Sequence, residues 1–299
     1  MAYDAIETPF GKRDRIVGGS AVYVAYAASN FVKPVNLVSI IGNDFEETEI
    51  RALEAIGSSF EGVEKIKDKK SFFWSGKYHL DMNTRDTLVT DLNVLADFNP
   101  VIPDSYQDAE FLMLGNLHPA VQISVINQMK TRPKLIAMDT MNFWISSAMD
   151  DLKKVLRMVD VLLVNDAEAR ELTNEYSLVK AARKIMAMGP RFLIIKKGEH
   201  GALLFHANEV FVAPALPLEE VFDPTGAGDT FAGGFIGHLA RIKDISFENM
   251  KTAIIVGSAM ASFCVEKFGP ERLKELTKGE IDDRIRQFIG LTNFDISLV

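Results

Sequence analysis

Four short apolar runs in the middle of the chain constrain its fold most. Each is apolar almost throughout, as is typical of parallel strands that helices cover on both faces. The runs span residues 111–115, 134–139, 159–165 and 191–196, and helix-patterned segments near 119–130, 147–158 and 177–188 separate them. The alternation predicts an α/β fold around a mainly parallel sheet, in which ligands bind at the carboxyl ends of the strands.

The heptapeptide Asp223-Pro-Thr-Gly-Ala-Gly-Asp229 gives the clearest chemical signal, because a helix-patterned run follows it directly at 230–241. Its glycines permit a sharp turn, and a turn that begins a helix leaves backbone N–H groups unpaired beside the positive end of the helix dipole. Such groups can hold an anion. The expected donors are Gly226, Ala227 and Gly228.

Asp229 stands inside this positive pocket, where it would repel a bound phosphate unless it took part in the reaction. Phosphoryl transfer gives it a role, because a carboxylate can accept the proton of an attacking hydroxyl while the amides neutralise the phosphoryl oxygens. Alternatively, Asp229 only caps the first helical turn and the glycines form a loop.

The run resembles the C-terminal signature of the ribokinase-like (PfkB-type) carbohydrate and nucleoside kinases, D-P/T-x-G-A-G-D-x-F, and the match is continuous from 223 to 236. The resemblance covers most of the chain and implies a ribokinase-like three-layer α/β/α fold with a small β-sheet lid. It also implies transfer of the γ-phosphoryl group of ATP to a hydroxyl, with Mg²⁺ as cofactor. Asp229 would be the catalytic base, and the amides of residues 226–228 would form the anion hole.

The same resemblance places the acceptor site near the N-terminus. Family members open with an apolar strand, and this chain begins inside or after it, so that much of the first strand is expected to be missing. Asp4 would accept hydrogen bonds from a sugar hydroxyl, unless it is a solvated terminal acid. Tyr23 replaces an Asn of the ribose kinases, which argues against ribose; it stacks on a sugar or nucleobase, or belongs to the core. The substrate-binding candidates are Asp4, Gly18, Gly19, Ser20, Tyr23 and Asn142.

Further elements are expected to handle the metal and the nucleotide. Asn165-Asp-Ala-Glu168 follows a buried strand and matches the N-x-x-E element of the family, which organises Mg²⁺ through water. Alternatively, its acids stabilise a helix dipole. By analogy, Asp223 would lie beside a monovalent cation, K⁺. The nucleotide-binding candidates are Lys197, Gly198, Gly201, Thr225, Gly228, Gly257, Ser258 and Ala261.

The pattern changes between residues 70 and 98. Two strand-like stretches, 71–80 and 87–95, flank a polar turn at 81–86. Together with residues 5–17, this region would form the lid that excludes water from the acceptor site. Its exposed aromatic face would also pair two subunits, unless these aromatic side chains pack in the core. The aromatic residues concerned are Phe73, Trp74 and Tyr78.

Composition excludes several other classes of protein and binding partner. The 299 residues, 47% of them hydrophobic, suffice for one domain over 1–299. A net charge of −8 argues against nucleic-acid binding, because nucleic-acid-binding surfaces are basic. The single cysteine excludes an intramolecular disulfide and a cysteine-based zinc site. The longest apolar run, 253–265, is too short to span a bilayer and the start lacks a signal-peptide pattern, so a cytoplasmic protein without a membrane partner is expected.

These features predict an ATP-dependent kinase that phosphorylates a hydroxyl of a small sugar or sugar-like molecule. The P-loop motif GxxxxGK[ST] is absent from the sequence, and no GxGxxG follows its first strand. Two alternatives remain open. One is a nucleoside kinase of the adenosine type, and the other is a non-catalytic regulator that binds ligands on the same fold.

Overall fold

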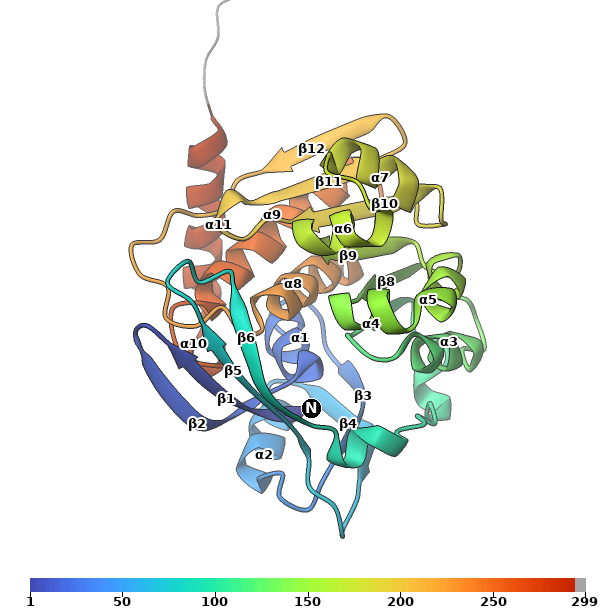
Figure 1. The fold of residues 1–299 in the computed structure, drawn as a ribbon, viewed down its shortest axis with the longest axis vertical. Coiled ribbons are helices and arrows are strands. Elements are labelled where there is room, and N and C mark those ends of the chain that lie inside the picture. The colour runs from blue at the N-terminus through green and yellow to red at the C-terminus, as the bar shows by residue number, and fades with distance from the viewer. Residues whose placement is uncertain (294–299) are drawn as a thin grey trace, which may run out of the picture.

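The structure, a computed structural model, describes residues 1–293 and contains a central sheet with helices on both faces beside a smaller sheet (Figure 1). The central sheet has the strand order β12-β11-β10-β9-β8-β7. Its strands are β7 (Phe111–Leu114), β8 (Leu135–Asp139), β9 (Val161–Asn165), β10 (Phe192–Lys196), β11 (Ala202–His206) and β12 (Glu209–Ala213). The first four pair in parallel and the last two are antiparallel, which confirms the predicted sheet.

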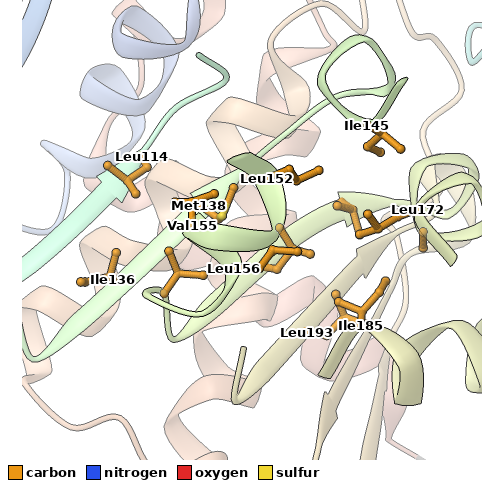
Figure 2. Packing of buried hydrophobic residues seen from close by; sticks show 14 of the residues in the cluster. Leu114, Ile136, Met138, Ile145, Leu152, Val155, Leu156, Leu172, Ile185 and Leu193 are labelled. Atoms are coloured by element: carbon orange, nitrogen blue, oxygen red, sulfur yellow. The ribbon is translucent and has the colours of Figure 1, made fainter. Parts of the chain in front are cut away.

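Helices cover both faces of the central sheet. Residues two apart on a strand point to the same face. On one face, Ile136, Met138 and Leu193 pack against the helices between the strands (Figure 2). These helices are α3 (Pro119–Asn127), α4 (Asn142–Ser147), α5 (Met149–Leu156), α6 (Asp166–Thr173) and α7 (Leu178–Met186). On the other face, Ile194 packs against α8 (Ala227–Ile242) and α9 (Phe247–Cys264).

The C-terminal helices α10 (Glu271–Lys274) and α11 (Lys278–Thr292) follow α9. Of the predicted helices, 119–130 and 177–188 are confirmed as α3 and α7, whereas 147–158 begins later because α4 precedes α5 with only Ala148 between them. Across residues 1–293, no helix combines the length and the apolar character that a membrane crossing requires.

The smaller sheet lies at the lower left of Figure 1 and has the order β2-β1-β5-β6. Its strands are β1 (Ala2–Thr8), β2 (Gly11–Gly18), β5 (Phe72–Tyr78) and β6 (Arg85–Asp91). β1 pairs with β5 in parallel, and the other two pairs are antiparallel. The predicted strand at 87–95 ends early because a 3-10 turn, Asn93–Asp97, follows it. Tyr78 is buried in a cluster with Ile6 and Phe268, so this side chain packs in a core.

A third sheet has two strands and lies below α1 in Figure 1. β3 (Val35–Ile41) and β4 (Ser58–Lys65) pair in parallel, with α2 (Glu47–Ala55) between them in the chain.

α1 (Ser20–Ala28) packs directly on α8. A Cβ atom on Gly233 of α8 would lie 2.6 Å from the carbonyl oxygen of Val24, and one on Gly237 would lie 2.9 Å from the Cα of Ala28. The two helices therefore meet backbone to backbone.

Candidate active site

The heptapeptide 223–229 forms a tight turn that leads into α8. Gly226, the N-cap of α8, has φ 77°, in the left-handed region that favours glycine. Asp223 is fully buried, and its carboxylate holds the turn in place through two hydrogen bonds. Its Oδ1 accepts the N–H of Thr225 at 2.8 Å, and its Oδ2 accepts the N–H of Gly269 at 2.8 Å. The turn is therefore held to the segment that follows α9.

Of the three predicted donors, two are available to an anion. Those of Gly226 and Gly228 have no acceptor among residues 1–293. The N–H of Ala227 differs from expectation, because the turn closes on itself and this group donates to the carbonyl of Pro224 at 3.2 Å. The prediction of three free donors was therefore wrong for Ala227. The other two still lie at the positive end of the α8 dipole.

Asp229 lies in the first turn of α8. Burial raises the pKa of its carboxyl to about 6, and the nearby Asp139 carboxylate adds to this effect. The Ser20 hydroxyl, the Lys196 ammonium and the α-amino group of Met1 act in the opposite direction. A carboxyl with this pKa is mostly ionised at pH 7 yet basic enough to accept a proton during a reaction.

Lys196, at the end of β10, is a further candidate functional residue, which the sequence-based predictions did not include. Its Nζ lies 2.9 Å from Oδ2 of Asp139, which ends β8. A Cβ on Gly228 would lie 2.9 Å from the same Nζ, so the ammonium lies against the anion-binding turn. Burial favours the neutral amine, but Asp139 and Glu168 outweigh it and raise the pKa of Lys196. The residue therefore keeps its charge beside the turn.

The parity of β10 explains why Lys196 rather than Lys197 reaches this place. Ile194 points toward α8 and α9, and Lys196 follows it on the same face. Lys197 leaves the strand and begins the short 3-10 turn Gly198–His200. The alternation of side chains along the predicted strand was the signal that could have identified Lys196.

Asn165 and Glu168 form a capping box at the start of α6. The N–H of Asn165 donates to Oε2 of Glu168, and the N–H of Glu168 donates to Oδ1 of Asn165, both at 2.8 Å. Burial raises the pKa of Glu168 to about 7; Asp139 adds to this, whereas Lys196 and Arg85 of the smaller sheet oppose it. No group of three or more His, Cys, Asp or Glu side chains within residues 1–293 could hold a metal ion. A divalent cation here would need oxygens from a phosphate or water.

Asp4 and the Gly18–Gly19 turn form one wall of the site. A Cβ on Gly18 would lie 1.9 Å from Oδ2 of Asp4, so only glycine leaves room for this carboxylate. Asp4 is 5% exposed, which rules out a solvated terminal acid. Burial, with Asp223 and Asp229, raises the pKa of Asp4 to about 7. Gly19 has φ 85° and caps α1, and Ser20 is the first residue of that helix.

Two other acceptor-site candidates lie differently. Tyr23 is 1% exposed and lies beneath Gly226, so its ring has no open face on which a sugar or base could stack. Asn142 begins α4 on the surface, and its Oδ1 accepts the N–H of Phe143 at 3.0 Å. Of the predicted substrate residues, the structure therefore brings together Asp4, Gly18, Gly19 and Ser20.

The nucleotide candidates fall into two groups. Lys197, Gly198 and Gly201 form the turn after β10, in which both glycines have positive φ. Gly257 instead lies in the α8–α9 interface, where a Cβ would be 2.7 Å from the carbonyl oxygen of Phe231. Its neighbours on α9, Ser258 and Ala261, are half-buried.

The smaller sheet contacts the rest of the structure at the turn 223–229 and at the turn after β10. The hydroxyl of Thr225 donates to the Tyr78 hydroxyl at 3.1 Å. A Cβ on Gly198 would lie 2.4 Å from Oδ1 of Asn83, at the tip of the β5–β6 hairpin. Arg85, at the start of β6, is close enough to lower the pKa of Glu168. The hairpin therefore reaches from the turn 223–229 to the turn that follows β10.

Comparison with known proteins now identifies the family. The profile described as pfkB family carbohydrate kinase matches residues 10–275. The chain belongs to this family. This pfkB-family kinase is 30% identical over 245 residues to a cytidine kinase of Thermococcus kodakarensis, with 81% of the chain and 86% of the relative covered. It is 25% identical over 272 residues to a nucleoside kinase of Methanothermobacter thermautotrophicus, covering 85% and 80%.

Solved structures of pfkB-family relatives share the fold. A nucleoside kinase of Burkholderia thailandensis in complex with ADP-inosine superimposes with a TM-score of 0.76 at 22% identity, covering 97% of this chain and 94% of that one. A nucleoside kinase of Methanocaldococcus jannaschii gives 0.76 at 18% identity, covering 96% and 95%. The ribokinase-like fold is thereby confirmed. The family and its kinase relatives show an ATP-dependent phosphotransferase that acts on a hydroxyl of a sugar or nucleoside.

Proposed function

We propose that the protein transfers the γ-phosphoryl group of ATP to a hydroxyl of a small sugar or of the sugar ring of a nucleoside, with Asp229 as the base. One observation carries this proposal. The hydroxyl of Ser20, the residue after the Gly18–Gly19 turn, approaches Asp229 on one side. The Lys196 ammonium also acts on Asp229, and it lies against the turn whose free N–H groups belong to Gly226 and Gly228. A base, an acceptor wall and an anion hole therefore meet at one carboxylate.

In the proposed mechanism, the acceptor hydroxyl lies between Asp229 and the γ-phosphate. Its oxygen forms a bond to phosphorus as its proton moves to Asp229, and the bond from the γ-phosphorus to the bridging oxygen breaks to release ADP. The N–H groups of Gly226 and Gly228 and the Lys196 ammonium neutralise the transferring oxygens. Asp4, Gly18, Gly19 and Ser20 hold the acceptor in place.

The donor set around α6 fits a divalent ion that is shared with the nucleotide. Asn165 and Glu168 supply amide and carboxylate oxygens, and Mg²⁺ would neutralise phosphate charge there. The capping box leaves both side chains at the helix start, where they would bind the ion through water. We also propose K⁺ beside Asp223 and Thr225; faster turnover in KCl than in choline chloride would support it, and equal turnover would exclude it.

The nucleotide would lie along the turn after β10 and the start of α8. We propose that Lys197, Gly198 and Gly201 approach its phosphate side, together with Thr225 and Gly228. Ser258 and Ala261 would line the adenine, while Gly257 provides room by letting α8 and α9 approach closely.

The smaller sheet would act as the lid, with residues 5–17 and 70–98 of the single domain 1–299. Its contacts at Tyr78 and Asn83 support this role. We further propose that the lid pairs two subunits through β6, an edge strand whose seven residues are all exposed. Light scattering after gel filtration would give twice the monomer mass, and a monomer at micromolar concentration would exclude the pairing. The reaction would take place in the cytoplasm, where ATP is available.

A nucleoside is the acceptor that the relatives favour, since proteins named cytidine kinase and nucleoside kinase match most of the chain. The test is ADP release from Mg-ATP with a panel of pentoses, hexoses, sugar acids, sugar phosphates and nucleosides. One class of acceptor should give turnover that Asp229→Asn abolishes. Binding of ATP without turnover of any acceptor would instead support a non-catalytic regulator.

A further inference from the structure

Asp139, the last residue of β8, has a buried carboxylate whose orientation the surrounding chain fixes. Its Oδ1 accepts the N–H of Thr140 at 2.8 Å. Its backbone carbonyl accepts a hydrogen bond from Nε2 of Gln122, a buried side chain of α3, at 3.1 Å. The same Nε2 donates to the carbonyl of Gly115 at 2.8 Å, so Gln122 links the ends of β7 and β8. One oxygen of Asp139 is thereby held by the backbone, and the other is left for a second partner.

That second partner is the ammonium group of Lys196. Oδ2 of Asp139 lies 2.9 Å from its Nζ, and Lys196 makes no other side-chain hydrogen bond within residues 1–293. An ammonium has three N–H donors, so two of them remain for a ligand. The Nζ lies against the turn 223–229, because a Cβ on Gly228 would be 2.9 Å from it. The unused donors of Lys196 therefore belong to a group that lies beside the free N–H groups of this turn.

No other carboxylate in the described part of the chain is within hydrogen-bond distance of Lys196. Glu168 and Asp229 favour its charged form only through space. Oε2 of Glu168 already accepts the N–H of Asn165, and Asp229 is assigned to the reacting hydroxyl. A buried ammonium is costly unless a carboxylate pairs with it. Asp139 is therefore the group that determines where this ammonium lies.

We propose that Asp139 is a positioning residue, which holds the Lys196 ammonium against the turn 223–229 so that its two unused N–H groups bind the γ-phosphate of ATP. This inference rests on the proposed function and refines it. Asp139 acts through Lys196 and does not itself touch the nucleotide. The γ-phosphate is the group concerned, because Lys196 lies beside Gly228, the residue before the proposed base. The affinity for ADP should therefore not depend on Asp139.

A double-mutant cycle separates this role from a structural one. Calorimetry would measure the affinities of ADP and of a non-hydrolysable ATP analogue for the parent protein, Asp139→Asn, Lys196→Met and the double variant. Asp139→Asn should reduce the preference for the analogue over ADP about tenfold, because the ammonium is no longer held in place. In the Lys196→Met background, the same substitution should leave this preference unchanged.

Turnover should follow the same pattern. At pH 8, where Asp229 is ionised, Asp139→Asn should lower kcat about tenfold and leave the KM for the acceptor unchanged. It should cause no further loss of kcat in Lys196→Met. Asp160→Asn is the matched control, since Asp160 is a buried carboxylate that pairs with two arginines just before β9, at the opposite end of the same sheet. This control should lose stability but keep the parent nucleotide preference and kcat.

An unchanged preference in Asp139→Asn would overturn the inference, and so would equal losses of affinity for ADP and the analogue. A loss that persists in the Lys196→Met background would overturn it too, because the carboxylate would then act without the lysine. That comparison needs only Lys196→Met and the double variant, so it holds even where Asp139→Asn alone does not fold.

The two assays also distinguish this inference from the proposed function. Coupling between Asp139 and Lys196 in nucleotide binding, without turnover of any acceptor, would refute the kinase proposal alone. Turnover in which the two substitutions cause independent losses would refute the positioning role alone.

Discussion

Lys196 and Asp139 form an ion pair of 2.9 Å across the carboxyl ends of β10 and β8, with β9 between them. Their side chains are only 17% and 9% exposed, so neither charge is well solvated. The pair links the ends of β10 and β8 across the end of β9, which is Asn165. Both charges act on the Asp229 carboxyl: Asp139 raises its pKa and Lys196 lowers it.

Lys196→Met should lower kcat about a hundredfold or more and raise the KM for ATP, because it removes the cation beside Gly228 and leaves the Asp139 carboxylate unpaired. Steady-state kinetics at saturating acceptor would measure both effects. Lys180→Met, at an exposed position of α7, is the control and should behave like the parent. Parent-like kinetics in Lys196→Met would remove Lys196 from the site.

Asp229→Asn should retain ATP binding and lose about a thousandfold or more in kcat, since the amide cannot accept the proton of the acceptor hydroxyl. Stopped-flow or quench measurements of ADP formation would give the rate, and calorimetry would give the nucleotide affinity. Turnover within tenfold of the parent rate would show that another group is the base.

The fall of kcat/KM at acid pH should follow the protonation of Asp229. Because its pKa is about 6, kcat/KM for the acceptor should fall about tenfold per pH unit below 6 and level off above it. Asp139 raises this pKa by its negative charge, so Asp139→Asn should move the limb to lower pH. A limb that stays in place in this variant would contradict the predicted coupling.

Asp4→Asn should stabilise the protein at pH 8 and have little effect near pH 4. The folded state raises the pKa of Asp4 from about 3.9 to about 7 and so binds its proton more tightly than the unfolded state. The tighter proton binding contributes to the free energy of unfolding below pH 4, and this contribution is lost as the pH rises through 7. The total loss is at most about 4 kcal/mol. Chemical denaturation at both pH values would measure the difference, and a loss of stability at pH 8 would oppose the prediction.

Gly18→Ala should raise the KM for the acceptor at least about tenfold without changing the KM for ATP, because the new methyl group would displace the Asp4 carboxylate. Gly279→Ala is the matched control, as nothing lies within 4 Å of the Cβ position in α11. That control should keep parent kinetics and gain about 0.5–1 kcal/mol of stability. Similar acceptor kinetics in both variants would separate Gly18 from the acceptor site.

The sequence was sufficient for the parts of the fold that depend on local pattern. The sequence pattern predicts the strands β7 to β10 and the glycine turn before α8, because each combines a hydrophobic period with residues that favour a turn. The alternation along β10 gives the face on which Lys196 lies, but its ion pair with Asp139 and the approach of Arg85 to Glu168 could not be predicted, since both depend on how distant segments meet. Ala227 was misjudged because the N–H that its position leaves free in an ideal helix start is used within the turn itself.

The backbone contact between α1 and α8 has a consequence for how acceptor preference can evolve. Ser20 and Asp229 stand at the first turns of two helices that Gly233 and Gly237 hold together without intervening side chains. A larger residue at either glycine would separate the two helices and misplace Asp229, the proposed base, for every acceptor alike. Variants that broaden the choice of acceptor should therefore accumulate in the β5–β6 hairpin, whereas the paired helices should accept almost no change in side-chain size.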